Sequence, residues 1–74
     1  MWSEKLIEQT KEKAWPGAMM KKTGGKHGMM SCREADEIKI VAIEFKDYMP
    51  FPTDEVIASY KDIDAMIADG WVID

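Results

Sequence analysis

Cysteine, histidine and arginine each occur once in this chain of 74 residues, and their scarcity excludes several kinds of protein. The single cysteine, Cys32, cannot form an internal disulfide, and a lone thiol fits a reducing compartment. The longest apolar runs fall far below the roughly 20 residues that span a bilayer, and the first residues lack the basic and apolar regions of a secretory signal. We therefore expect a cytoplasmic protein with no membrane partner.

The chain is short, and its charge is unevenly distributed. A chain of this length buries only about 60% of the surface that its unfolded form exposes, so we expect one small domain, residues 1–74. A bound partner or a homodimer could supply further burial. The net charge is −4, but residues 1–33 hold seven lysines or arginines against three glutamates, whereas residues 34–74 hold three lysines against eleven acidic residues. This asymmetry favours a surface that binds a partner.

Two segments have helical signals. Ser3 can cap a helix over residues 3–14, which Trp15-Pro16-Gly17 then ends. After Thr53, a plausible second N-cap, apolar residues recur at helical spacing: Val56, Ile57, Tyr60, Ile63, Met66 and Ile67. The pattern predicts a second, amphipathic helix that ends at Gly70.

The segment MMKKTGGKHGMM, residues 19–30, predicts a β-hairpin, because Gly24-Gly25 can form a two-residue turn. This register would pair Lys22 with His27, Met20 with Met29, and Met19 with Met30, and would put one methionine pair on each face.

Two further strands and one loop complete the expected fold. Residues 36–46 predict a central strand, either bulged near Ile40 or buried on both faces, and residues 71–73 predict a short last strand. Pro50 and Pro52 predict a loop over residues 47–52. We therefore expect an α+β fold with an N-terminal helix, a three-stranded antiparallel meander, a second amphipathic helix and a short C-terminal strand.

Catalytic, metal and cofactor sites are not expected. His27 and Cys32 lie on opposite faces of an extended strand, so they could not act together as base and nucleophile. No second histidine and no Cys-x-x-Cys pair completes a metal site, and the Gly25-Lys26 pair lacks the spacing of a phosphate-binding loop. We therefore expect no enzyme, no metal and no cofactor.

The hairpin is the expected partner-binding site, because methionines adapt to many binding surfaces and lysines surround them. Its expected partner-binding residues are Met20, Lys21, Lys22, Lys26, His27, Met29 and Arg33. The sequence thus predicts a small non-catalytic protein-interaction module that binds a protein partner through this hairpin or through its acidic helix face. By analogy, such a module would be a regulatory or inhibitory accessory protein, as phages and mobile elements encode. The alternative is a nucleic-acid-binding protein that uses the basic hairpin of residues 18–33.

Overall fold

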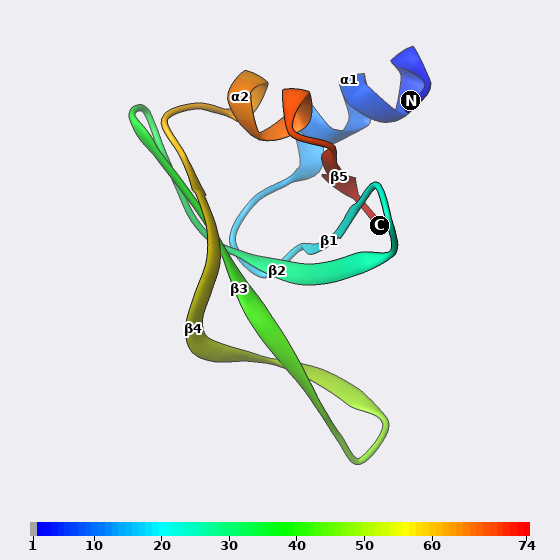
Figure 1. Cartoon of the computed structure of the whole chain (residues 1–74), viewed down its shortest axis with the longest axis vertical. Helices are drawn as coiled ribbons and strands as arrows, with labels where there is room; N and C mark the ends of the chain where they lie inside the picture. The colour runs from blue at the N-terminus through cyan, green and yellow to red at the C-terminus, as the bar shows by residue number, and fades with distance from the viewer. Residues whose placement is uncertain (1) are drawn as a thin grey trace.

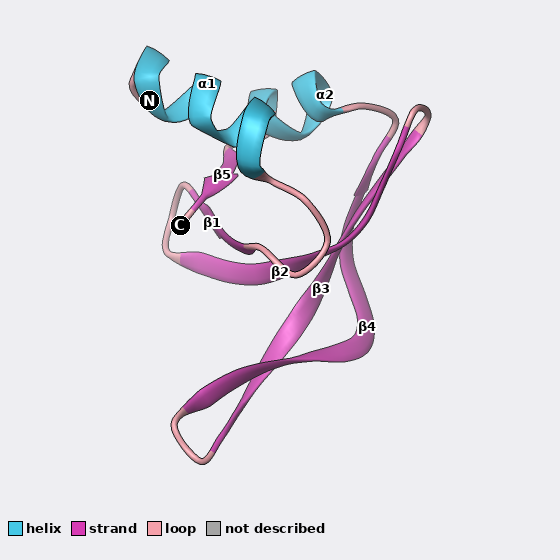
Figure 2. Ribbon diagram, turned by 180° about the vertical axis from the view of Figure 1, so that it is seen from behind, coloured by secondary structure: helices cyan, strands magenta, loops and turns pink. Residues whose placement is uncertain are grey.

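The computed structural model describes residues 2–74, which form two helices and a five-stranded antiparallel sheet (Figures 1 and 2). The elements in chain order are α1 (Glu4–Lys13), β1 (Met19–Lys22), β2 (Lys26–Glu34), β3 (Glu37–Lys46), β4 (Met49–Tyr60), α2 (Ile63–Ala68) and β5 (Trp71–Ile73). The strand order is β4-β3-β2-β1-β5. The predicted fold class is therefore wrong, because most of the chain is sheet and the sheet is not a three-stranded meander.

The two helices and the turn of the β3–β4 hairpin lie at opposite ends of the molecule (Figures 1 and 2). Both helices lie beside β5, and the hairpin extends away from them, so that its turn forms the far end in both views (Figures 1 and 2). The longest dimension of the molecule is 34 Å. We call residues 43–55, the distal part of this hairpin, the arm.

Helix α1 follows its local signals. The Ser3 hydroxyl accepts a hydrogen bond from the Leu6 N–H at 3.2 Å, as an N-cap should. Thr10 is buried, and its hydroxyl donates to the Leu6 carbonyl at 2.8 Å and accepts from the Ile73 N–H at 3.0 Å. The helix predicted over residues 3–14 is confirmed, and one buried hydroxyl connects it to the last strand.

The predicted β1–β2 hairpin is present, but its register differs by one residue. Lys22 pairs with Lys26, so the turn contains Thr23 as well as the two glycines, both of which have positive φ. Because side chains alternate along a strand, this shift changes which methionines share a face. Met20 pairs with Gly28, and Met19 with Met29. The predicted pairing of Met20 with Met29 is therefore wrong.

The predicted second helix is wrong over its first half. Residues 49–60 form β4, which pairs with β3, so the expected loop over residues 47–52 is also strand beyond its turn. The helical segment is only α2, which Asp62 rather than Thr53 caps: the Asp62 carboxylate accepts from the Ala65 N–H at 2.8 Å. Gly70 follows α2 with a φ of 104°, and β5 forms as predicted.

Bulges bend the β3–β4 pair. The register shifts between Ile40 and Val41 and again between Val41 and Ile43, close to the expected bulge. Thr53 fills the wider irregularity, since its hydroxyl donates to the Ala42 carbonyl at 2.9 Å. Bulges increase the local twist, and the arm leaves the body of the sheet just beyond this point (Figure 1).

The core lies between the sheet and the helices. Its buried cluster consists of Ala14, Met20, Met30, Ile38, Ile40, Met66 and Trp71. Met20 and Met30 thus share the inner face of the hairpin, while Met19 and Met29 are half-buried on the outer face. None of the helices within residues 2–74 is long and apolar enough to cross a membrane.

Candidate interaction surface

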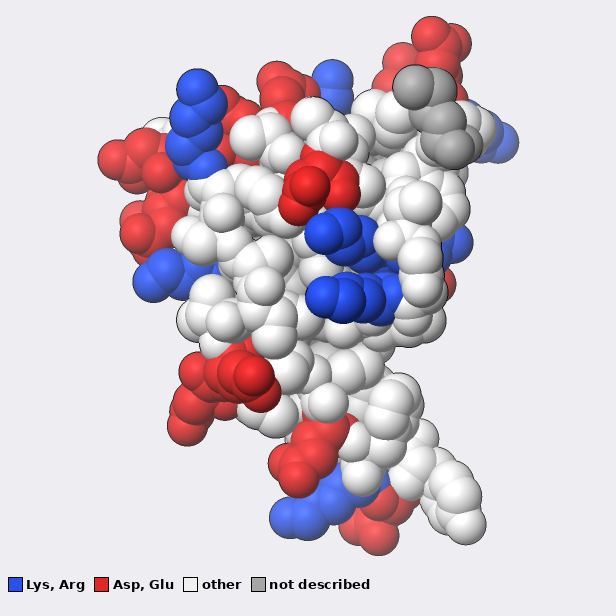
Figure 3. Space-filling model, viewed as in Figure 1, with Lys and Arg blue, Asp and Glu red and all other residues white. Residues whose placement is uncertain are grey.

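The lysines and the histidine of the predicted hairpin site lie close to acidic residues of the same chain. Lys22 Nζ lies 3.3 Å from an Asp69 oxygen, and both Lys21 Nζ and His27 Nε2 lie 3.9 Å from an Asp74 oxygen. Lys26 is exposed, with no ion pair to any residue in the described part of the chain. Figure 3 shows the same interleaving of basic and acidic atoms around the hairpin and the helices. Acidic residues of the same chain therefore offset much of the positive charge of the hairpin.

The two methionines of the predicted site do not form one surface. Met20 is fully buried in the core, whereas Met29 is half-buried on the opposite face beside Val41 of β3. A partner could reach Met29 but not Met20 without unfolding the hairpin.

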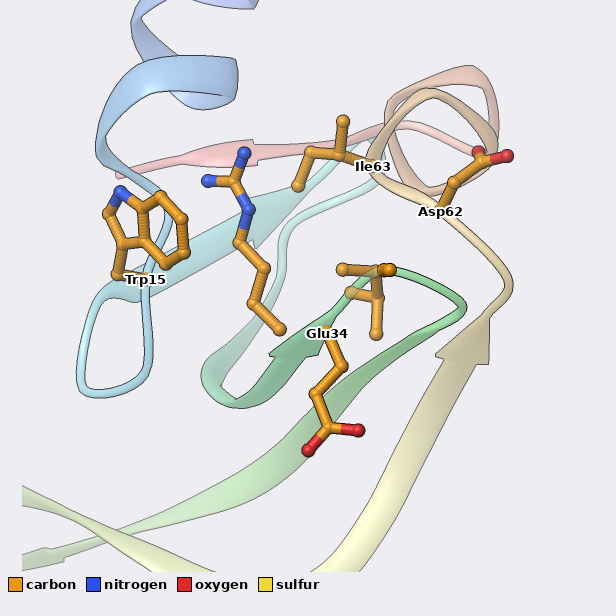
Figure 4. Close-up of a pocket in the computed structure, with 7 residues that line it drawn as sticks. Trp15, Glu34, Asp62 and Ile63 are labelled. Atoms are coloured by element: carbon orange, nitrogen blue, oxygen red, sulfur yellow. The ribbon is translucent and has the colours of Figure 1, made fainter.

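Arg33, the last residue of the predicted site, binds the end of α1. Its guanidinium donates to the carbonyls of Ala14 at 3.0 Å and Lys11 at 2.7 Å, and it stacks on the Trp15 ring with 4.0 Å to the centroid. These are carbonyls that a helix leaves unpaired at its C-terminus. A pocket of about 320 Å³ lies beside this contact, with Trp15 and Ile63 on its walls and the Glu34 carboxylate directed away (Figure 4).

Cys32 and His27 do not form a reactive pair. The Cys32 thiol contacts the Glu37 backbone carbonyl and carboxylate, at 3.9 and 3.8 Å. Burial, followed by the charges of Glu34 and Glu37, raises the pKa of the Cys32 thiol, which disfavours the nucleophilic thiolate. Residues 2–74 contain no group of three or more His, Cys, Asp or Glu side chains that could hold a metal ion.

A polar cluster connects β4 to the end of α2. The Tyr60 hydroxyl donates to the Asp69 carboxylate, which also pairs with Lys22. Burial and this hydrogen bond raise the pKa of Tyr60 to about 12, while the Tyr60 hydrogen bond and then Lys22 lower the pKa of Asp69. The Trp71 indole N–H lies near Tyr60 and acts to lower the pKa of Tyr60. This N–H is buried and forms no hydrogen bond with any group in residues 2–74. The cluster borders a pocket of about 290 Å³.

The arm carries most of the large apolar side chains that are exposed in the described part of the chain. Seven large apolar side chains are exposed within residues 2–74, and four of them lie between residues 45 and 51. They are Phe45, Tyr48, Met49 and Phe51, with exposed fractions of 70, 101, 59 and 47%. Single exposed apolar residues are ordinary, but four large apolar side chains exposed within seven residues of one hairpin favour a binding surface.

The turn of the arm holds Tyr48 in a strained conformation. Asp47 and Tyr48 both have positive φ, 53° and 65°, as a two-residue type I′ turn requires. Asparagine and glycine adopt this conformation readily, whereas for a bulky residue it is an outlier that costs on the order of 1–3 kcal/mol. Since the Tyr48 side chain is fully exposed, contacts within the described residues do not compensate this cost.

Apolar side chains project from both faces of the arm. Phe45 pairs with Pro50, and these two side chains share one face. Met49 and Phe51 pair with Lys46 and Glu44 on the other face. The arm is therefore shaped to enter a groove rather than to lie on a flat surface.

The backbone of the arm offers little to a further strand. Pro50 and Pro52 lie two residues apart on β4, the edge strand of the sheet, and neither has a backbone N–H. Prolines in sheets are confined to positions like these, which blunt strand-to-strand association. A partner would thus bind the arm through its side chains.

The arm is acidic. Glu44, Asp47, Asp54 and Glu55 lie on it against one lysine, Lys46, a net charge of −3. Figure 3 shows acidic atoms along the arm, and acidic, basic and uncharged atoms side by side at its lower end. A complementary surface would be apolar with a basic rim.

This surface was not expected, because the sequence predicted a strand only up to residue 46, a loop over residues 47–52 and a helix after Thr53. The available signal was local: Phe45, Tyr48, Met49 and Phe51 fall within seven residues, next to two prolines and between acidic residues. Comparisons with known proteins add no relationship, because no family model, no curated protein and no solved structure matches the chain.

Proposed function

We propose that the chain is a small non-catalytic protein-interaction module whose arm is its docking surface. The observation that carries this proposal is Tyr48, a fully exposed aromatic residue held at a φ of 65°. The strain at Tyr48 is not offset by contacts of its side chain within the described residues, so a partner that contacts this side chain would explain why the strain is kept. Tyrosine is also among the residues that contribute most binding energy at protein interfaces.

The rest of the arm supports a protein partner over a nucleic acid. Its net charge of −3 would repel phosphates, and its apolar side chains lie on both faces. The basic hairpin keeps the nucleic-acid alternative open, but three of its side chains lie near Asp69 or Asp74. The raised pKa of Cys32 supports a non-catalytic role.

A regulatory or inhibitory role in the cytoplasm fits this description. The free thiol of Cys32 suits a reducing compartment, and a small module with one projecting arm can occupy a groove on a larger protein.

Quantitative capture from a cell extract tests the proposal. After nuclease treatment of the extract, the immobilised full chain and its Val56→Thr variant should retain the same proteins. Val56→Thr is the matched control, because it changes an exposed apolar residue outside the arm. The double variant Phe45→Ser, Phe51→Ser should lose them while its circular dichroism spectrum stays that of the parent. Equal capture by all three proteins would contradict the proposal, and retention of nucleic acid alone would favour the alternative.

A further inference from the structure

An apolar pocket lies at the end of the molecule opposite the arm. It measures about 400 Å³ and lies between the start of α1, the end of α2 and the β1–β2 turn. Its walls are Trp2, Ile7, Thr23, Ile67, Ala68 and Gly70. The Trp2 indole N–H donates to the Gly70 carbonyl at 2.7 Å and fixes one wall. A pocket of this size and apolar character suits an aromatic side chain.

We propose that this pocket binds the arm of a second copy of the chain, with Tyr48 as the inserted side chain. This inference rests on the proposed function of the arm as a docking surface and names its partner. The pocket lies at the helical end and the arm at the other end of a molecule 34 Å long (Figure 1). An arm therefore cannot reach the pocket of its own molecule, so the Tyr48 side chain of this proposal comes from a second copy.

The charges around the two surfaces are complementary. Lys21 Nζ lies 5.3 Å from the centroid of the Trp2 ring in the pocket wall, and the Lys22 side chain lies close to Gly70 in the same wall. Asp47 precedes Tyr48 on the arm, so an inserted Tyr48 brings a carboxylate to these lysines. Lys21 and Lys22 now pair with Asp74 and Asp69 in partly exposed ion pairs, which exchange partners at little cost.

The contact joins two different surfaces of the same chain. Two molecules related by a two-fold axis would make it twice, whereas an open array would make it once per molecule. In either arrangement, loss of the side chain or closure of the pocket weakens self-association. Self-association would also bury apolar surface that the small core of a single copy leaves exposed.

Two variants separate the two surfaces without disturbing the fold. Tyr48→Asn removes the inserted ring, and asparagine tolerates the positive φ of this position, so the turn is kept or stabilised. Ala68→Trp fills the pocket from an exposed position at the end of α2. Circular dichroism and thermal unfolding report whether each variant folds as the parent does.

Sedimentation equilibrium over a wide concentration range tests the inference. We expect the parent to self-associate, more weakly at high salt, and each variant alone to associate at least about tenfold more weakly. An equimolar mixture of the variants should associate more strongly than either variant alone, because one keeps the pocket and the other keeps Tyr48. A parent that stays monomeric, a Tyr48→Asn protein that associates like the parent, or a mixture that associates no more strongly than the separate variants would each overturn the inference. The parent could be monomeric while the Phe45→Ser, Phe51→Ser variant captures fewer proteins from the extract than the parent does. That result would support the arm as a docking surface and refute only the proposal that a second copy of the chain is its partner.

Discussion

Replacement of Gly28 by alanine should destabilise the protein, because β2 passes unusually close to its neighbours there. Gly28 is buried opposite Met20, and an added Cβ would lie 2.6 Å from Ile40 Cγ2, 3.0 Å from the Val41 carbonyl oxygen and 3.2 Å from Ile57 Cδ1. Ile40 is buried and β-branched, so its Cγ2 cannot rotate away easily. Overpacking of this kind costs about 1–3 kcal/mol.

The net effect of Gly28→Ala is smaller than the overpacking alone. Alanine loses less backbone entropy on folding than glycine, which offsets about 0.5–1 kcal/mol of this cost. The middle of the two ranges gives a net loss of about 1 kcal/mol. For a domain this small, each kcal/mol lowers the melting temperature by about 4–8 °C. Urea unfolding monitored by tryptophan fluorescence measures the loss. In an Ile40→Ala background, which removes the nearest atom, the same change should cost less, because only the Val41 carbonyl oxygen and Ile57 Cδ1 then remain close to the added Cβ. An equal loss in both backgrounds would refute the close approach to Ile40.

Two other predictions concern polar contacts. Arg33→Gln should lower the free energy of unfolding by about 1–3 kcal/mol in urea titrations, because it removes two charged hydrogen bonds to the α1 carbonyls; an unchanged midpoint would mean that these bonds contribute nothing. Tyr60 should titrate near pH 12 in the tyrosinate absorbance, a transition that Tyr60→Phe removes. The pKa of Tyr60 is raised on folding, so its contribution to stability is complete below about pH 10 and is lost between pH 10 and 12. Titration near pH 10 would show that neither burial nor the Asp69 hydrogen bond holds the phenol in its protonated form.

The local parts of the fold could be predicted from the sequence. Ser3, Trp15-Pro16-Gly17 and Gly70 act on their immediate neighbours, so α1 and the end of α2 follow from them directly. The hairpin was also predictable, but its register was not. A two-residue and a three-residue turn share the same Gly-Gly signal, and only the close packing of Gly28 against β3 and β4 distinguishes them.

The error in the second half has a different cause. Val56, Ile57 and Tyr60 continue the helical spacing of Ile63 and Ile67, yet the first three belong to β4 and the last two to α2. Spacing alone cannot detect the boundary, because the pairing of β4 with β3 is a tertiary contact that overrides it.

The arm was missed because exposure is not a local property. Pro50 and Pro52 argue against a central strand, but an edge strand tolerates them when their nitrogens point away from the neighbouring strand. Without the sheet order, neither this tolerance nor the exposure of Tyr48 could be derived.

The position of β5 beside β1 determines the order in which the molecule can fold. Met20 pairs with Ile73, and the buried Trp71 reaches the core from the same last strand. The β2–β3 and β3–β4 hairpins close short loops and can form early, whereas the β1–β5 pair must close a loop of about 50 residues at a larger entropic cost. We therefore expect β5 to join the sheet last. Until residues 71–73 are in place, the methionine core is open on one side, so the chain must finish folding rapidly or bind a chaperone to avoid aggregation.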